Sequence, residues 1–96
     1  MNRTFTFSGK IDGDDCVVFV DSWQVGGGYE ISPTGFRWGY GGAGPARTAW
    51  AVLEHVFGEE FADEHAHDFK DSVVANLPFD EPFTVTIDLE TLEVVQ

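Results

Sequence analysis

The most distinctive chemistry in this sequence lies in a run of acidic residues between positions 59 and 71. The run consists of Glu59, Glu60, Asp63, Glu64, Asp68 and Asp71. On a helix these six carboxylates would span roughly 20 Å at about 1.5 Å per residue. The helix would then carry one negative charge per about 3.3 Å. This spacing is close to the one charge per about 3.4 Å along a DNA strand. Glu60, Glu64 and Asp68 recur every four positions and would form one row. The row predicts binding to a cationic groove that normally holds nucleic acid.

A second candidate is the glycine-rich run at residues 39–44, which fits the G-x-G-x-x-G pattern of dinucleotide sites. Such a site needs a strand, the glycine turn, a helix and then a parallel strand that carries a ribose-binding acid. Glu59 lies where that acid is expected, but the expected helix leads into another helix. We therefore favour a tight turn that lets Trp38 and Tyr40 pack against the following helix.

Histidine and cysteine residues suggest little further chemistry. His65 and His67 lie among acids, yet residues two apart on a helix point about 200° apart, so they cannot share one metal ion. We expect His65 to be partly buried against the sheet and His67 to be solvated. Cys16 precedes an apolar run and has no basic neighbour in sequence, which is typical of a small buried core residue. We expect no enzyme, no metal site and no cofactor.

The charge balance limits the class of partner. The 96 residues contain 17 Asp and Glu against 5 Lys and Arg, which gives a formal net charge of −12. Direct binding to nucleic acid or to an anionic membrane needs a basic patch, so neither is expected. The length predicts one domain, residues 1–96. No secretory signal or membrane-spanning stretch is visible, and we expect a cytoplasmic protein.

Hydrophobic periodicity indicates the elements that position these residues. Alternation predicts strands at 4–8, 17–20, 36–40 and 83–89, with the first two as a hairpin. The tail at 90–96 is expected either to return as a short strand through Val94 and Val95, which we favour, or to form a helical turn. Helical spacing and Pro45 predict a helix to residue 57, and a second helix covers 59–76. The expected fold is α+β: an antiparallel sheet, made of the N-terminal hairpin plus C-terminal strands, covered on one face by a two-helix hairpin.

Aromatic residues crowd the glycine-rich region. They are Trp23, Tyr29, Phe36, Trp38 and Tyr40. Exposed aromatics are common anchors at protein interfaces, so Trp38 and Tyr40 join the acidic run as candidate partner-binding residues. Packing over the end of the sheet is the competing interpretation, and we favour it.

The run Ser-Pro-Thr-Gly-Phe-Arg-Trp-Gly-Tyr-Gly-Gly-Ala-Gly-Pro-Ala at 32–46, with Phe69-Lys70 and residues 73–78, resembles a small family of unknown function found in bacteria and phages. The resemblance covers residues 32–78, implies a loop followed by two helices, and supplies no catalytic residue. A small acidic phage-associated protein is also similar in kind to anti-CRISPR inhibitors that mimic DNA. If the protein is phage-encoded, the cytoplasm is that of the host cell.

These observations favour a small, acidic, non-enzymatic inhibitor that occupies the nucleic-acid groove of a basic protein, such as a CRISPR effector subunit. Two alternatives remain open. The acidity is also typical of a salt-adapted cytoplasmic domain whose charge maintains solubility. A nucleotide- or metal-binding enzyme is the third hypothesis.

Overall fold

The N-terminal third forms a meander of antiparallel strands. The computed structural model describes residues 3–13, 15–25 and 36–95. Strand β1 (Thr4–Asp12) pairs with β2 (Asp15–Val20), and the short β3 (Trp23–Gln24) pairs with β2. Phe5 and Phe7 point into the core between the more exposed Thr4, Thr6 and Ser8, as the alternation predicts. The predicted hairpin is confirmed.

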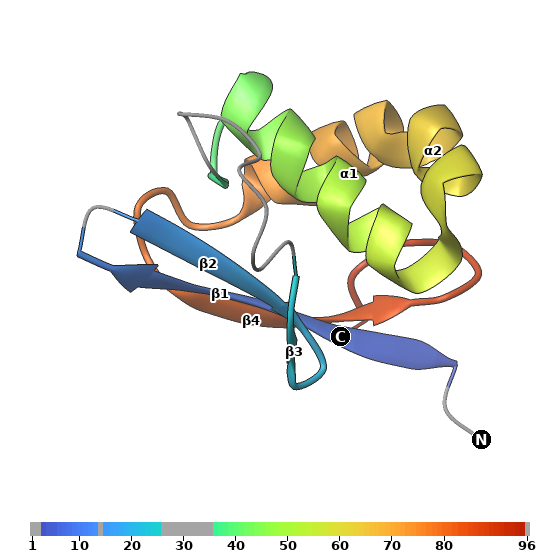
Figure 1. Cartoon of the computed structure of the whole chain (residues 1–96), viewed down its shortest axis with the longest axis horizontal. Helices are drawn as coiled ribbons and strands as arrows, with labels where there is room; N and C mark the ends of the chain where they lie inside the picture. The colour runs from blue at the N-terminus through green and yellow to red at the C-terminus, as the bar shows by residue number, and fades with distance from the viewer. Residues whose placement is uncertain (1–2, 14, 26–35, 96) are drawn as a thin grey trace.

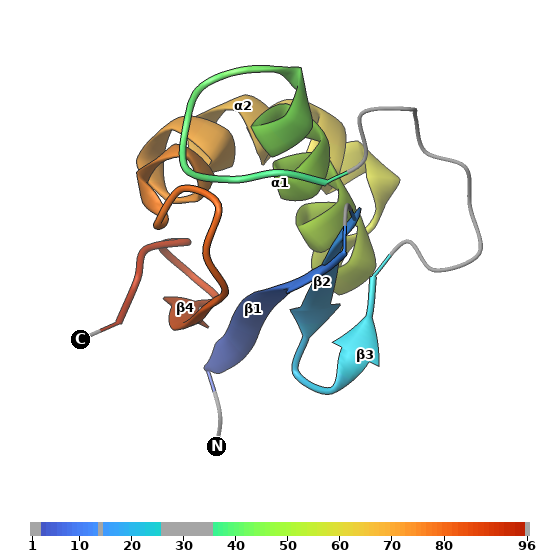
Figure 2. The ribbon, with the colours of Figure 1, turned by 90° about the vertical axis from the view of Figure 1, so that its left-hand side faces the viewer.

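Strand β4 (Phe83–Asp88) returns to pair with β1, so the sheet order is β3-β2-β1-β4 and all pairs are antiparallel. The helices α1 (Ala43–Phe57) and α2 (Glu59–Ser72) lie together on one face of this sheet (Figures 1 and 2). The α+β fold with a helical hairpin over an antiparallel sheet is therefore confirmed. No helix among the described residues has both the length and the apolar character to cross a membrane.

The two helices are separated by a single residue, Gly58. Its φ of 101° lies in a region that side chains rarely adopt, which explains glycine at this position. Its N–H donates to the Glu54 carbonyl and completes the last turn of α1. Ala49, Val52 and Leu53 of α1 and Ala62 and Phe69 of α2 are buried in the same core as the strands. The apolar stripes of the helices thus fix which faces remain outside.

Helix α2 ends earlier than the predicted residue 76. It stops at Ser72, and a short 3-10 helix, η1 (Val74–Asn76), follows. The amide of Asn76 donates to the carbonyls of Asp71 and Ser72, which are among the last unpaired groups of α2. The Asn76 side chain thus satisfies backbone carbonyls at the C-terminus of α2. The helix can therefore end at Ser72, before the predicted stop at Leu77-Pro78.

The predicted strand at 36–40 is wrong. Residues 36–38 run as a loop, and Gly39 turns the chain with φ 89°. The Thr48 hydroxyl accepts from the backbone N–H of Arg37 at 3.0 Å and donates to its carbonyl at 2.7 Å. One buried side chain of α1 thus satisfies the groups that a neighbouring strand would bond.

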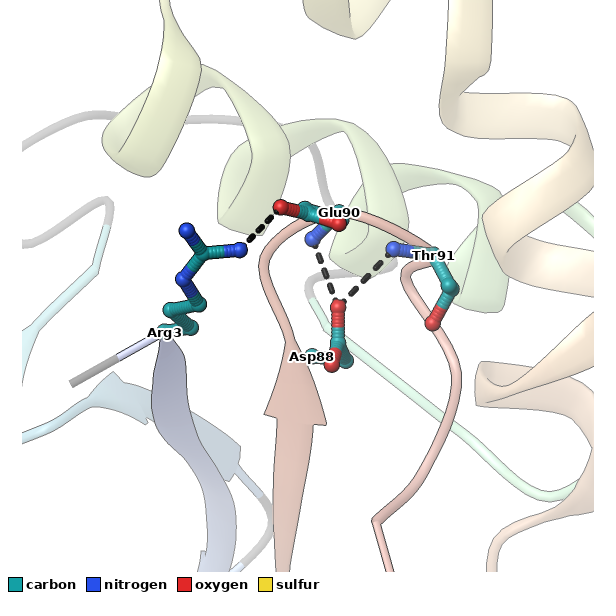
Figure 3. A network of polar contacts seen from close by, with 4 residues as sticks. All are labelled: Arg3, Asp88, Glu90 and Thr91. Atoms are coloured by element: carbon teal, nitrogen blue, oxygen red, sulfur yellow. Dashed lines mark hydrogen bonds and ion pairs between the residues drawn. The ribbon is translucent and has the colours of Figure 1, made fainter.

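The predicted tail strand reduces to one isolated bridge between Ile87 and Val94. A turn intervenes after β4, because the Asp88 carboxylate accepts from the backbone N–H groups of Glu90 and Thr91 at 2.7 and 3.0 Å (Figure 3). These hydrogen bonds lower the pKa of Asp88 below its usual 3.8, with a smaller contribution from Arg3. Arg3 itself forms an exposed ion pair with Glu90 (Figure 3).

Candidate functional site

All six predicted acids of α2 are exposed. We call Glu59, Glu60, Asp63, Glu64, Asp68 and Asp71 the acidic face of α2. At about 100° per residue they span one half of the helix circumference, opposite the half that carries buried Ala62 and Phe69. Lys70 is the single Lys or Arg in the α2 sequence. Six carboxylates and one ammonium give α2 a formal charge of −5 when its histidines are neutral.

Two members of the acidic face also have structural partners. Asp63 accepts a hydrogen bond from the indole N–H of Trp50 at 2.8 Å, which joins α2 to α1. The Asp71 carboxylate lies 3.2 Å from His67 Nε2, through Oδ2, and 3.3 Å from Lys70 Nζ, through Oδ1. The bond from Trp50 makes Asp63 part of the contact between the helices, whereas the partners of the exposed Asp71 are neighbours on α2 itself.

Glu60, Glu64 and Asp68 form a single row along α2, each four residues from the next. Glu64 Oε2 lies 4.0 Å from His65 Nε2, which is the longest distance that counts as an ion pair. Like charges at this spacing destabilise a helix by a few tenths of a kcal/mol per pair, so folding alone does not favour the row. Glu60 gains some compensation from the positive end of the helix dipole. Within the acidic face, this row is the part best suited to bind an external cation.

The described acids outside α2 are dispersed. Asp12, Asp15 and Asp21 lie on the N-terminal strands and the turn after β2, Glu54 lies on α1, and Asp80, Glu81, Asp88, Glu90 and Glu93 lie around β4. Among the described residues, α2 therefore carries six of the fifteen acids, and the other nine are divided among several elements.

The two candidate aromatic anchors have different environments. Trp38 is only 2% exposed, packs edge-on against Phe83 and donates its indole N–H to the Glu81 carbonyl at 2.8 Å. It is a core residue, and its assignment to the partner-binding set is corrected. Tyr40 is 38% exposed and lies edge-on to Phe79, which is 65% exposed, with ring centres 5.8 Å apart. Tyr29 lies outside the described residues, as does the segment 32–35 of the family-like motif.

The glycine run is a packing turn. A Cβ on Gly39 would lie 2.5 Å from the Phe79 Cα, and one on Gly44 would lie 2.7 Å from the Arg37 Cβ. In the described residues 36–38 that precede this turn, the strand that a dinucleotide fold requires is not formed, and α1 leads into α2 rather than into a parallel strand. Gly39 and Gly44 allow close approach of neighbouring chain segments, as expected for a tight turn. The predicted packing on the following helix applies to Tyr40, which lies beside Gly44 at the start of α1, whereas Trp38 packs against Phe83 of β4.

The exposure of the two histidines is as predicted, but the ring contact of His65 is with Phe61 of its own helix and not the expected contact with the sheet. His65 is half-buried and stacks on Phe61 with ring centres 4.2 Å apart, whereas the His67 side chain is 77% exposed. Among the residues that the structure describes, no three His, Cys, Asp or Glu side chains gather closely enough to hold a metal ion.

Cys16 differs from its sequence-based prediction. It is half-buried, and the Arg37 guanidinium donates to its Sγ at 2.9 Å. The absence of a basic neighbour in sequence is misleading, because the loop before α1 brings Arg37 to the start of β2. No local signal in the sequence identifies this pair.

Cys16 and Arg37 belong to a surface hollow of about 320 Å³. Its other lining residues are Trp38, Tyr40, Phe79 and Asp80. The hollow is formed by the loop before α1, the loop before β4 and the start of β2. Periodicity cannot predict it, because the two loops meet through contacts that are distant in sequence.

Comparison with known sequences identifies one family. A profile described as "Family of unknown function (DUF6166)" matches residues 7–94 of the 96-residue chain. No curated protein and no solved structure gives a significant match.

Proposed function

The chain belongs to the DUF6166 family of unknown function, and we propose that it is a small, acidic, non-enzymatic inhibitor that occupies the nucleic-acid-binding groove of a basic protein. The acidic face of α2 is the binding element. The proposed partner is a CRISPR effector subunit in the bacterial cytoplasm, which is the host cytoplasm if a phage encodes the protein. The protein then acts as a DNA mimic.

The observation that carries this proposal is the arrangement of α2. Six exposed carboxylates share half of one helix, and a single lysine accompanies them. A groove lined by Lys and Arg attracts such a face through the same charge complementarity that attracts a phosphate backbone. The row of Glu60, Glu64 and Asp68 has an energetic cost within the helix that binding to cations would offset.

Competition with DNA tests this function. CRISPR effectors are loaded with a labelled target duplex, and the protein is titrated while fluorescence anisotropy follows the bound DNA. We expect the wild type to displace DNA from one of the effectors, with a potency that falls steeply as salt rises. The variant Glu60→Lys/Glu64→Lys/Asp68→Lys should lose this activity. Full inhibition by that variant, or no displacement from any effector, would contradict the proposal.

Salt adaptation is the second candidate, and the dispersed acids favour it. Acids such as Asp12, Asp21 and Glu93 lie far from α2 in sequence and follow no row. A surface of this kind is solubilising, and its self-repulsion weakens the folded state at low salt. The candidate predicts a marked rise in melting temperature in molar KCl, and an unchanged melting temperature contradicts it.

A further inference from the structure

An exposed aromatic pair lies on the loops before α1 and before β4, outside helix α2. Phe79 is 65% exposed and Tyr40 is 38% exposed, and their rings meet edge-on. Large aromatic side chains placed in this way are frequent anchors in protein interfaces. The backbone of the two loops that carry Tyr40 and Phe79 sets the position of the two rings.

Two unusual backbone conformations fix the pair. Gly39 has φ 89° and lies against the backbone of Phe79 too closely to admit a side chain, while Asp80 has φ 58° without being glycine. The Gly39 N–H donates to the Val74 carbonyl at 2.9 Å. Glycine adopts a positive φ readily, whereas a non-glycine residue with a positive φ, such as Asp80, is uncommon and often occurs where a ligand is held. The loops before α1 and before β4 therefore lie in close contact beneath the two rings.

The rings border the hollow of about 320 Å³, whose lining includes one cationic residue, Arg37, and one anionic residue, Asp80. The Arg37 guanidinium donates to Cys16 Sγ at 2.9 Å and to the Phe36 carbonyl at 3.0 Å. Asp80 directly follows Phe79 in the chain. The part of the lining formed by Tyr40, Phe79 and Asp80 thus combines two aromatic residues with one carboxylate.

This combination suits a cation. Aromatic faces attract ammonium and guanidinium groups, and a nearby carboxylate adds charge complementarity. The volume is at the low end of the range for small-molecule sites and suits one long side chain. The net charge of −12 also favours a cationic occupant.

We propose that the part of this hollow lined by Tyr40, Phe79 and Asp80 binds an arginine side chain of the protein partner, as a second contact in addition to the acidic face of α2. This inference rests on the proposed function for the identity of the partner. It assigns Phe79 and Asp80, which no sequence pattern singled out, to partner binding. Tyr40 keeps the anchoring role that the sequence predicted, and Phe79 takes the place of Trp38.

Titration with small side-chain analogues tests the site without the natural partner. N-acetyl-arginine amide is added to the isotope-labelled protein, and NMR follows the indole N–H signal of Trp38, which lines the hollow. N-acetyl-norleucine amide and N-acetyl-aspartate amide are the apolar and anionic comparisons. We expect a saturable shift with the arginine analogue that exceeds the shift with either comparison. Equal or larger shifts with norleucine or aspartate, or no shift with arginine, would overturn the proposal.

Variants separate this site from the acidic face. Phe79→Leu retains apolar volume but lacks a ring, and Asp80→Asn removes the charge at a position with φ 58°, which asparagine tolerates. Both should weaken arginine binding several-fold, whereas Trp23→Leu, a change at an exposed aromatic in β3, should not. Glu60→Gln/Glu64→Gln/Asp68→Asn should leave this titration unchanged even if it abolishes inhibition. Unaltered binding by both Phe79→Leu and Asp80→Asn contradicts the site.

Discussion

At the residue scale, Thr48 links α1 to the loop that precedes it. It is fully buried, and its hydroxyl holds the backbone N–H and carbonyl of Arg37. Thr48→Val keeps the shape of the side chain but leaves both groups without this partner. We expect a loss of about 1–3 kcal/mol in the free energy of unfolding, measured by urea denaturation. Thr84→Val, at an exposed position of β4, should stay within about 0.5 kcal/mol, and a similarly small change for Thr48→Val would contradict this role.

Asp88 gives a pH dependence at the same scale. Hydrogen bonds from the backbone of Thr91 and Glu90 lower its pKa below 3.8 in the folded state. A lowered folded pKa contributes stability that is fully present above the unfolded pKa and is lost as pH falls through the folded pKa. We expect wild type to be more stable than Asp88→Asn at neutral pH and this difference to shrink below pH 3.8, measured by denaturation across pH. A stability difference between the two proteins that stays constant down to low pH would contradict the role of the Asp88 carboxylate in this turn.

At the element scale, the acidic face of α2 divides into structural and free acids. Trp50 of α1 donates to Asp63, so Asp63→Ala should lower the free energy of unfolding by about 1 kcal/mol. Glu64→Ala, at the next position, should change it by a few tenths at most. In a Trp50→Phe background Asp63→Ala should have no further effect, because the donor is already absent. An equal loss in both backgrounds would show that Asp63 acts through another contact.

The elements that sequence predicts well are those with local periodicity. The alternation of Phe5 and Phe7 and the helical stripe of α2 depend on neighbours within a few residues, and both appear in the structure. The segment 36–40 alternates in the same way, yet Thr48 supplies its hydrogen bonds and no strand forms. The choice between strand and loop here depends on a residue of α1, which periodicity does not report.

The candidate sites differ for the same reason. Helical geometry alone places the six acids on the outer half of α2. Trp38 and Tyr40 have indistinguishable sequence contexts, but Gly39 turns the chain between them, so Trp38 enters the core and Tyr40 remains at the surface. The hollow lined by Cys16, Arg37 and Phe79 needs contacts between distant segments and could be found only in the structure.

At the scale of the whole molecule, net charge and charge arrangement make different predictions. A net charge of −12 attracts any polycation, whatever the position of the acids. The proposed function requires that the Glu60, Glu64 and Asp68 row contribute more than the same number of acids elsewhere. Asp12, Asp15 and Glu93 are the control set for this row, because they are also three exposed acids but lie outside α2. Asp12 and Asp15 pair across the hairpin of β1 and β2, and Glu93 lies in the tail.

The most direct measurement is calorimetric titration of an oligolysine peptide into three proteins at several salt concentrations. They are the wild type, Glu60→Gln/Glu64→Gln/Asp68→Asn, and Asp12→Asn/Asp15→Asn/Glu93→Gln. Both variants lose three negative charges. The α2 variant is predicted to lose most of the affinity and salt dependence of the wild type, while the other variant keeps most of both. Equal losses in the two variants would contradict a binding face on α2 and leave net charge as the sole source of attraction.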